Sequence, residues 1–406
     1  MVSLLTPDLA EIADLPGGRP TVQVKYVDTS DGGLWVTWRW EHALDRPRLA
    51  GIQPPLPALA ALRAAAPRPA DGETVPDALR RSWAVLGDVD QEMRLAEALA
   101  GALFPAPLVA ELEHFRARRP HLRVQGSPAL AVVPWEALRV DDGERLVHRC
   151  DVSLLLPASV RGSRTRTPAP HRPGGPVVAA VSPVVPGAVA SLEPVMRTSE
   201  PLVEAMLAGL GDRLRGTPAE GPVRSHLDRE RLRELLADAA RFLYVGHVSA
   251  GTYALGTSLH LTDGPEARGR APLVSGVHRP LLAADVALDG WAAPSRVALV
   301  GCASGGDTAY ADPAGLVAAF TARGAQYVTA ARWALPTDAG LDALTGSGTR
   351  SEAFARAVVA VDAAHEAADP VAALGAWQRE QAEAWERTGD PAHSPVVWAA
   401  LGTAWS

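Results

Sequence analysis

Two residues in this sequence combine a reactive side chain with a position that would present it, His247 and Cys302. Each closes a short apolar run, FLYVGH or VALVGC, and each follows a glycine that permits a tight exit from a strand. A cysteine becomes a nucleophile when a neighbour takes its proton or holds its thiolate, and histidine does both near neutral pH. The pair predicts nucleophilic catalysis, with Cys302 as the nucleophile and His247 as the general base.

The residues around this pair favour an oxyanion-binding site. The stretch CASGGDTAY has few bulky side chains, so its backbone amides are free to approach a substrate carbonyl. We expect the amides of Cys302 and Val248 to stabilise the oxyanion, with Gly305 and Gly306 keeping the approach open. Taken alone, either reactive residue is more often structural, because free cysteines are usually small buried hydrophobes. The other cysteine, Cys150, has no such context and is interpreted as a core residue.

The chain around both residues alternates apolar strands with amphipathic helices. Strands are predicted in RFLYVGH, SRVALVGC and QYVTAARW, and a helix is predicted in DPAGLVAAFTARGA. This alternation is typical of a mostly parallel sheet covered by helices on both faces, whose ligands bind beyond the carboxyl ends of the strands. His247 and Cys302 are 55 positions apart (302 minus 247), which is enough for one crossover between adjacent strands.

The chain before residue 121 predicts a smaller hairpin-plus-helices region, residues 1–120, that braces the core. TVQVKYVDTSDGGLWVTWRW alternates around Asp-Gly-Gly as a hairpin does, and ALRRSWAVLGDVDQEMRLAEALAGALF and LVAELEHFRARR have the spacing of two helices. Residues 121–406 are assigned to the catalytic domain. Within it, LVHRCDVSLLLP predicts a strand, and residues 160–176, rich in Arg, Pro and Gly, predict a loop open to proteolytic cleavage.

Composition and charge exclude several classes of partner. The formal net charge is -7, from 39 Lys and Arg against 46 Asp and Glu, and the absence of a basic block argues against a nucleic-acid partner. Two cysteines are too few for a disulfide framework and fit a reducing cytoplasm. We expect no secretory signal and no membrane partner, because no stretch reaches about 18 uninterrupted apolar residues. His260 and His278 fall in predicted loops without ligand spacing, so we expect no metal and no cofactor.

Segments spread over most of the chain resemble the CHAT family of caspase-like cysteine peptidase domains, which are related to caspases and separases. These segments are ALAVVPWEALRV, DVSLLLPASV, RFLYVGH, SLHLTDG, PLLAADVAL, SRVALVGCASGG, GLVAAFTARGAQYVTAARWALPTD and HSPVVWAALGTAW. Their order and spacing are more specific than any one of them. The resemblance implies a caspase-like α/β/α sandwich with a mostly parallel sheet, in which His247 and Cys302 hydrolyse a peptide bond through a thioester acyl-enzyme.

Two departures from the family pattern bear on activity and specificity. The family commonly has glycine after its histidine, where this chain has Val248, whose side chain is expected to narrow the approach. The family's acidic pair after the tryptophan is represented only by Asp338. In relatives that cut after a basic residue, an acidic side chain lines the primary pocket, so Asp338 or Asp307 is expected there with Trp333 as a wall. Asp338 also fits a helix cap, and Trp333 a core residue.

The sequence therefore predicts a cysteine endopeptidase that acts on a protein or peptide substrate and is controlled by an activating protein partner or by cleavage. A catalytically silent interaction module with the same fold is the alternative. A thiol hydrolase or acyltransferase acting on a small molecule also stays open, because the nucleophile chemistry is shared.

Overall fold

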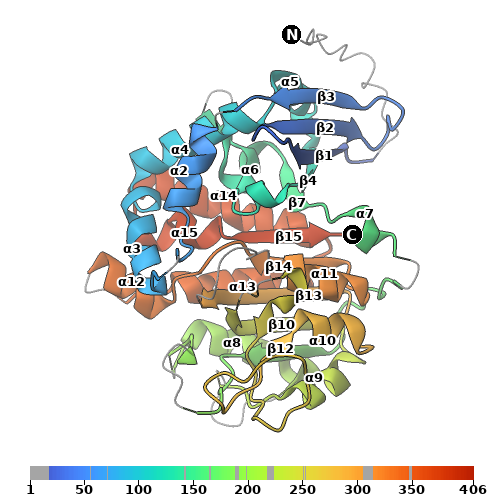
Figure 1. Ribbon diagram of the computed structural model, residues 1–406, viewed down its shortest axis with the longest axis vertical. Helices are drawn as coiled ribbons and strands as arrows, with labels where there is room; N and C mark the ends of the chain where they lie inside the picture. Colours follow the sequence, from blue (N-terminus) through green and yellow to red (C-terminus); the bar gives the residue numbers. More distant parts are fainter. Residues whose placement is uncertain are drawn as a thin grey trace.

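One long sheet forms the centre of the protein. The computed structural model describes residues 18–54, 56–70, 72–140, 143–163, 166–187, 192–197, 199–216, 224–249, 251, 253–304, 314–346 and 350–406. Within these residues the sheet has 13 strands, in the order β12-β11-β10-β13-β14-β15-β7-β4-β1-β2-β3, with β8 and β9 attached beside β10. Figure 1 shows the strands stacked along the long axis of the molecule, with β3 near the top and β12 near the bottom.

The strands are mostly short, and β1, β2, β10 and β13 are the longest. Their bounds are β1 Thr21–Asp28, β2 Leu34–Trp40, β3 Arg48–Ile52, β4 His121–Gln125, β7 Asp151–Leu154, β8 Val177–Val181, β9 Leu214–Arg215, β10 Arg241–Ser249, β11 Ser258–Leu259, β12 Leu281–Leu282, β13 Arg296–Ser304, β14 Tyr327–Ala331 and β15 Leu401–Trp405. A separate two-stranded sheet pairs β5 Arg139–Val140 with β6 Glu144–Arg145.

The sheet consists of two parallel blocks that run in opposite directions. Strands β8, β10, β13 and β14 are parallel to one another, and so are β15, β7, β4 and β1. The antiparallel pair β14–β15 joins the two blocks. The carboxyl ends of β10 and β13 therefore lie at the opposite edge of the sheet from the carboxyl ends of β4 and β7.

Helices cover both faces of the sheet. Their bounds are α2 Pro57–Ala65, α3 Val75–Leu86, α4 Val89–Leu103, α5 Ala106–His114, α6 Leu146–Arg149, α7 Ala158–Arg161, α8 Pro201–Leu210, α9 Arg229–Leu236, α10 Ala283–Leu288, α11 Ala314–Ala322, α12 Asp338–Thr345, α13 Ala353–Glu366, α14 Pro370–Thr388 and α15 Pro395–Trp398. Short 3-10 turns are η1 Arg116–Arg118, η2 Pro128–Leu130, η3 Trp135–Ala137, η6 Gly211–Arg213, η7 Ala254–Gly256 and η9 Pro391–His393.

The two faces of the block formed by β8, β10, β13 and β14 have different helical cover. On one face, which we call the α13 face, Leu243 and Val245 pack in a core cluster with residues of α8, α13, α14 and α15. On the other, the α11 face, Phe242 and Tyr244 pack with residues of α9, α10 and α11. Successive side chains of a strand point to opposite faces, so this alternation confirms the predicted α/β sandwich with cover on both sides.

The predicted hairpin is confirmed, but it is not a separate layer. β1 and β2 pair from Val22 with Trp40 to Asp28 with Leu34, and β1 then pairs in parallel with β4. The segment 1–120 thus contributes strands to the same sheet as the rest of the chain. β3 and α2 were not predicted, because the sequence there is short or rich in Ala and Pro.

The two stretches predicted as helices after the hairpin form three helices, α3, α4 and α5. The stretch predicted as one helix is divided into α3 and α4, because Gly87 ends α3 and the Asp88 carboxylate accepts the Gln91 N–H as the cap of α4. The segment LVHR is α6 rather than strand, and Cys150 lies between α6 and β7. Within the described residues no single helix is long and apolar enough to cross a membrane, although α4 and α5, bent by 102°, pass that test as a pair.

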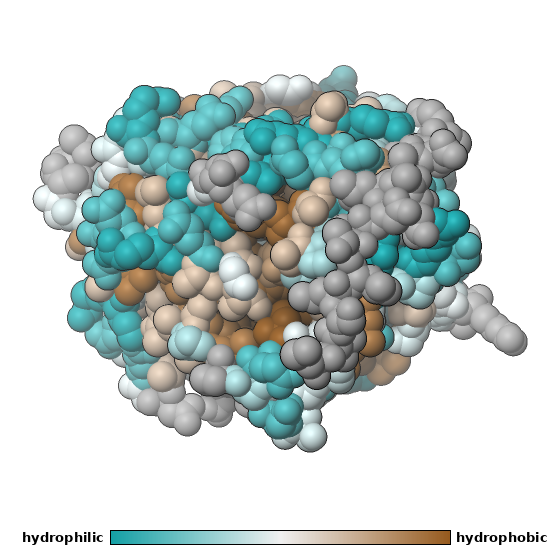
Figure 2. Space-filling view, turned by 90° about the horizontal axis from the view of Figure 1, so that it is seen from above, coloured by the Kyte–Doolittle hydropathy of each residue, from teal (hydrophilic) through white to brown (hydrophobic). Residues whose placement is uncertain are grey.

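The end of the molecule that carries β3 and α5 has a hydrophobic hollow ringed by hydrophilic residues (Figure 2). Four of the exposed large hydrophobic side chains belong to the amino-terminal strands and the loop beside them: Val27, Trp35, Leu44 and Leu49.

Candidate active site

Strand pairing brings the two reactive residues together. β10 and β13 are parallel neighbours, and their register places His247 directly beside Cys302. Adjacent strands are about 4.8 Å apart, so residues paired in this way are immediate neighbours. The sequence prediction that a single crossover would bring the two positions together is therefore correct at the level of the backbone.

Both positions belong to the α13 face. In β10, position 247 continues the series of Leu243 and Val245, and in β13 position 302 continues the series of Ala298 and Val300. The strands are rich in apolar and β-branched residues up to this point, which fits a sheet buried on both sides. After Arg241 at the start of β10, His247 and Ser249 are the next polar positions of this strand on the α13 face.

The hydrogen bond made by His247 fixes its tautomer. Its Nε2 lies 2.5 Å from the backbone carbonyl of Glu193. A carbonyl only accepts, so Nε2 carries the proton and the neutral ring has its lone pair on Nδ1. Nδ1 is buried and has no hydrogen-bond partner among the described residues. It is the atom that can take a proton.

Burial keeps this histidine neutral. Desolvation lowers the pKa of His247 below its usual value of 6.5, and the hydrogen bond to Glu193 opposes this only in part. A neutral imidazole with a free Nδ1 is the form required of a general base. Glu193, which orients the ring through its backbone, was not predicted, since a carbonyl partner leaves no signal in residue types.

The two glycines before the reactive residues have a role different from the predicted one. β10 and β13 do not end at Gly246 and Gly301 but continue to Ser249 and Ser304. A Cβ at Gly246 would lie 2.6 Å from the Tyr244 hydroxyl oxygen, and one at Gly301 would lie 2.3 Å from Cγ2 of Val248. The glycines therefore make room for neighbouring side chains on the α11 face.

Val248 lies away from the reactive face. Its side chain packs against the core cluster of the α11 face, above Gly301. The expectation that it narrows the approach to His247 is therefore wrong. The residue that replaces the family's glycine is accommodated on the opposite side of the sheet.

The predicted oxyanion donors lie inside the sheet. Pairing of β10 with β13 continues beyond the reactive positions through Val248–Ala303 and Ser249–Ser304. In this structure Val248 and Cys302 therefore belong to the β10–β13 ladder. The role of their backbone amides as oxyanion donors stays a prediction. Gly305, Gly306 and Asp307 fall outside the described residues.

Asp338 caps a helix, but not the helix that it begins. Its carboxylate accepts the N–H groups of Phe354, at 2.9 Å, and Ala355, at 3.1 Å, and so caps the start of α13. Burial raises the pKa of Asp338, while these hydrogen bonds act against the rise. Trp333 is 3% exposed in the core of the α13 face, and its indole N–H donates to the Val396 carbonyl. A pocket role for either residue stays a prediction.

A chain of polar contacts beside His247 was not expected from the sequence. The Ser249 hydroxyl lies 2.7 Å from Nε2 of His260, whose Nδ1 lies 3.1 Å from Nε2 of His278. Nδ1 of His278 donates to the Asp263 carbonyl at 2.7 Å. Both histidines lie outside the named strands and helices, as predicted, but their side chains are buried, and no pattern in the sequence indicates that they meet. No group of three or more His, Cys, Asp or Glu in the described part of the chain is placed to hold a metal ion.

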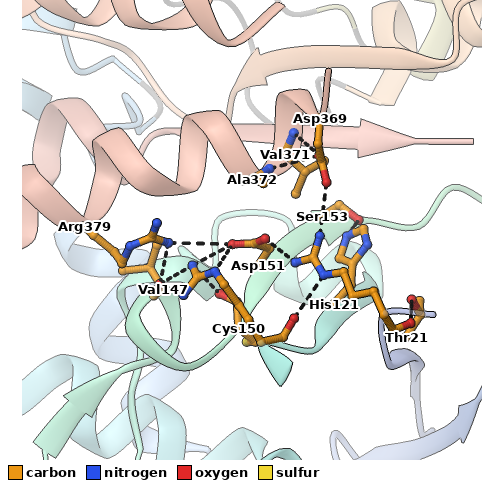
Figure 3. Close-up of polar contacts among 12 residues, drawn as sticks. Thr21, His121, Val147, Cys150, Asp151, Ser153, Asp369, Val371, Ala372 and Arg379 are labelled. Carbon is orange, nitrogen blue, oxygen red and sulfur yellow. Dashed lines mark hydrogen bonds and ion pairs between the residues drawn. The ribbon is translucent and has the colours of Figure 1, made fainter. Parts of the chain in front are cut away.

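The core interpretation of Cys150 is confirmed. Its thiol is fully buried and donates to the Leu146 carbonyl, and burial raises its pKa to about 12. Figure 3 shows it beneath Asp151, whose carboxylate receives Arg379 and other guanidinium groups. A buried thiol with a raised pKa is a poor nucleophile.

The predicted loop at 160–176 has little regular structure beyond the end of α7, but it is fastened to the body. The Arg166 guanidinium donates to the carbonyls of Thr321 and Ala325, and the Ala169 N–H donates to Gly324. Further along, the Arg172 guanidinium pairs with Asp238 at 2.9 Å. These contacts disfavour proteolytic cleavage of the loop.

The fold is a caspase-like α/β/α sandwich, and it places His247 and Cys302 at paired positions on adjacent parallel strands. A family model described as CHAT domain matches residues 93–404. The chain belongs to the CHAT domain family. No curated protein matches it.

Among solved structures, a chain in the Saccharomyces cerevisiae separase-securin complex is similar, with 12% sequence identity and a TM-score of 0.48. The match covers 95% of this chain and 30% of that chain, so this chain spans less than a third of that one's length.

Proposed function

We propose that the protein is a cysteine endopeptidase in which Cys302 is the nucleophile and His247 the general base. The observation that carries the proposal is the direct pairing of the two positions in the β10–β13 ladder. The tautomer of His247 supports it, because Nδ1 is the atom left to accept the thiol proton.

The chemistry then follows the arrangement of the two residues. His247 takes the thiol proton, and the thiolate of Cys302 forms a carbon–sulfur bond with the substrate carbonyl carbon. When the carbon–nitrogen bond breaks, the imidazolium returns its proton to the leaving amine. Water then attacks the thioester, with the same histidine as base, and releases the acid and the thiol.

A second candidate function is a silent interaction module with the same fold. It is favoured by the continuation of the ladder through Ser249 and Ser304, which keeps the Val248 and Cys302 amides in the sheet. Donors aimed at the developing oxyanion supply a large share of the rate in acyl transfer. Turnover in this protein therefore needs donors from elsewhere or an opening of the ladder.

The partners and location are part of the proposal. We place the protein in the cytoplasm, acting on a protein or peptide substrate without nucleic acid, membrane or cofactor. The contacts of Arg166 and Arg172 leave the loop at 160–176 poorly suited to activation by cleavage. An activating protein partner is the form of control that fits better.

Labelling with a peptidyl acyloxymethyl ketone tests the proposal. We expect the full chain to be labelled on Cys302, Cys302→Ala to be unlabelled, and His247→Ala to react about 100-fold more slowly. Cys150→Ala is the matched control and keeps the label, because Cys150 is buried. If a broad panel of such probes leaves the protein unlabelled even with candidate activators present, the silent module is the better description.

A further inference from the structure

A cavity of about 440 Å³ lies beside His247. Its walls include Ser249, Tyr253, His260, Val274 and Leu282. The volume falls in the range of cavities that hold small ligands or large side chains. It adjoins the position of His247, because the backbone N–H of His260, a wall residue, donates to the His247 carbonyl at 3.2 Å.

The strand register places this cavity on the reactive face. Ser249 of β10 pairs with Ser258 of β11, and Ser258 pairs with Leu282 of β12. These three positions lie side by side across the sheet, and Ser249 is on the same face as His247 because the two are two residues apart. The cavity therefore extends from Ser249, two residues after His247, toward β12 and away from β13, which carries Cys302.

The imidazole and guanidinium groups of the cavity wall already have partners. The Ser249 hydroxyl is bound to His260, and His260 to His278. Desolvation lowers the pKa of His260 to about 3, so its ring is neutral. Arg270 at the cavity is bound by the carboxylates of Asp289 and Asp285, at 2.6–2.9 Å.

This pairing decides what the cavity can hold. A charged substrate side chain entering it would lose water and find no counter-charge to replace it, because Arg270, the one charged residue of the wall described, is already bound by Asp285 and Asp289. An apolar side chain needs no partner and gains from contact with Leu282, Val274 and the neighbouring prolines, Pro272 and Pro280.

We infer that this cavity binds an apolar side chain of the residue that follows the scissile bond. The inference rests on the proposed peptidase function. The leaving amine receives its proton from His247, so the leaving part of the substrate lies on the His247 side of Cys302. In the strand order β12-β11-β10-β13, that side is the one occupied by the cavity.

Peptide-library digestion tests the inference in the full chain. Proteome-derived peptides are digested with the wild type and with Cys302→Ala, and mass spectrometry identifies the residue after each Cys302-dependent cut. We expect enrichment of Leu, Ile, Val, Met and Phe there, and cleavage about tenfold or more slower where that residue is charged. Cleavage without this preference would overturn the inference and leave the proposed function intact.

A charge substitution sharpens the test. Val274→Glu adds a carboxylate to the cavity wall and is expected to shift the preference toward Lys and Arg after the cut. Leu273→Glu is the matched control, because Leu273 is 39% exposed and does not line the cavity. The same shift in both variants would show that the cavity does not select the residue.

A binding measurement separates the cavity from turnover. Cys302→Ala is titrated with leucinamide and with lysinamide by NMR. Each of these amides mimics the amine that leaves after cleavage. We expect leucinamide to bind at least about tenfold more tightly, and Val274→Glu to reverse the order. If leucinamide binds but no peptide is cut and no electrophile labels Cys302, the peptidase proposal fails while the apolar selectivity of the cavity stands. If leucinamide and lysinamide bind equally, the inference is wrong.

Discussion

Val248 and Gly301 are coupled across the β10–β13 pair. A Cβ at position 301 would meet Cγ2 of Val248 at 2.3 Å, well inside van der Waals contact. Val248 faces Ala303, and it is accommodated because the diagonal position on the neighbouring strand is a glycine, Gly301. A change at Val248 should affect activity only indirectly, since the Val248 side chain lies on the face opposite to His247.

Gly301→Ala is expected to destabilise the protein by about 1–3 kcal/mol, because the new methyl group overpacks the α11 face. Urea unfolding of Gly301→Ala, Val248→Ala and the double variant measures the coupling. The cost of Gly301→Ala should be smaller in the Val248→Ala background. Gly101→Ala is the control: its Cβ meets nothing within 4 Å, and helix propensity predicts a small gain. Additive costs for the pair would argue against the coupling.

At the scale of elements, a buried ion pair joins the two blocks of the sheet. Arg332, just after β14, donates to the Glu136 carboxylate of η3 at 2.8 Å, and both side chains are at most 3% exposed. The Arg332 guanidinium also donates to the carbonyls of Ala399 and Leu401. The glutamate of the segment PWEAL thus holds the turn that leads from β14 to Trp333.

Removing one partner of this pair should be costly. Glu136→Gln leaves the buried Arg332 without its counter-charge, and the expected loss is about 3–5 kcal/mol of unfolding free energy. The exposed pair of Arg231 with Glu234 provides the control, because Glu234→Gln should change stability by about 0.5 kcal/mol or less. Equal effects of the two substitutions in thermal or urea unfolding would contradict the role given to Glu136.

The contacts of the loop at 160–176 predict that it resists proteolysis. Arg166 ties this loop to the end of α11 through the Thr321 and Ala325 carbonyls. We expect wild type to resist limited trypsin digestion there, and Arg166→Ala to be cut several-fold faster at its remaining arginines. Mass spectrometry of the fragments gives the site, and cleavage of both proteins at the same rate would show that the contact does not protect the loop.

The elements that the sequence predicted are those with long, regular patterns. The β1–β2 hairpin alternates apolar and polar residues, whereas β10, β13 and α11 are nearly continuous apolar runs, and in each case the local pattern agrees with the tertiary packing. The division between α3 and α4 depends on the cap at Asp88, which a periodic apolar pattern conceals.

The sequence predicted the positions of His247 and Cys302 but not the residues around them. His247 and Cys302 were found because strand-end placement and residue type coincide. The Ser249–His260–His278 chain joins residues from β10 and two irregular segments, and no local pattern reports that these segments meet. The role of Asp338 as a cap for α13 depends likewise on a contact 16 positions away.

At the scale of the whole molecule, three buried histidines determine how the fold responds to acid. His121, His260 and His365 each contact a hydroxyl oxygen, those of Ser153, Ser249 and Thr329. Burial lowers the pKa of each to about 3, from 6.5. Between these values the unfolded chain binds more protons than the folded chain, so stability is full above about pH 6.5 and is lost as pH falls toward 3.

His121→Gln should make the unfolding free energy less dependent on pH in this window, by up to about 1.4 kcal/mol per pH unit. Urea unfolding at pH 7, 6, 5 and 4 measures the slope for the wild type and the variant. Asp338 and Asp362, whose pKa values are raised by burial, act in the opposite sense, and the comparison with the variant isolates the histidine. Parallel pH profiles would show that His121 is not held neutral by the fold.

The register of β10 against β13 also determines which insertions and deletions leave His247 and Cys302 paired on the same face of the sheet. Loss or gain of one residue within either strand, ahead of His247 or Cys302, would turn that position to the α11 face, because side chains alternate with a period of two. A change of length in the connecting chain between the strands leaves the parity of both strands as it is. Whether the number of residues that precede His247 or Cys302 in its strand is even or odd therefore matters more for their pairing than the 55 positions between them.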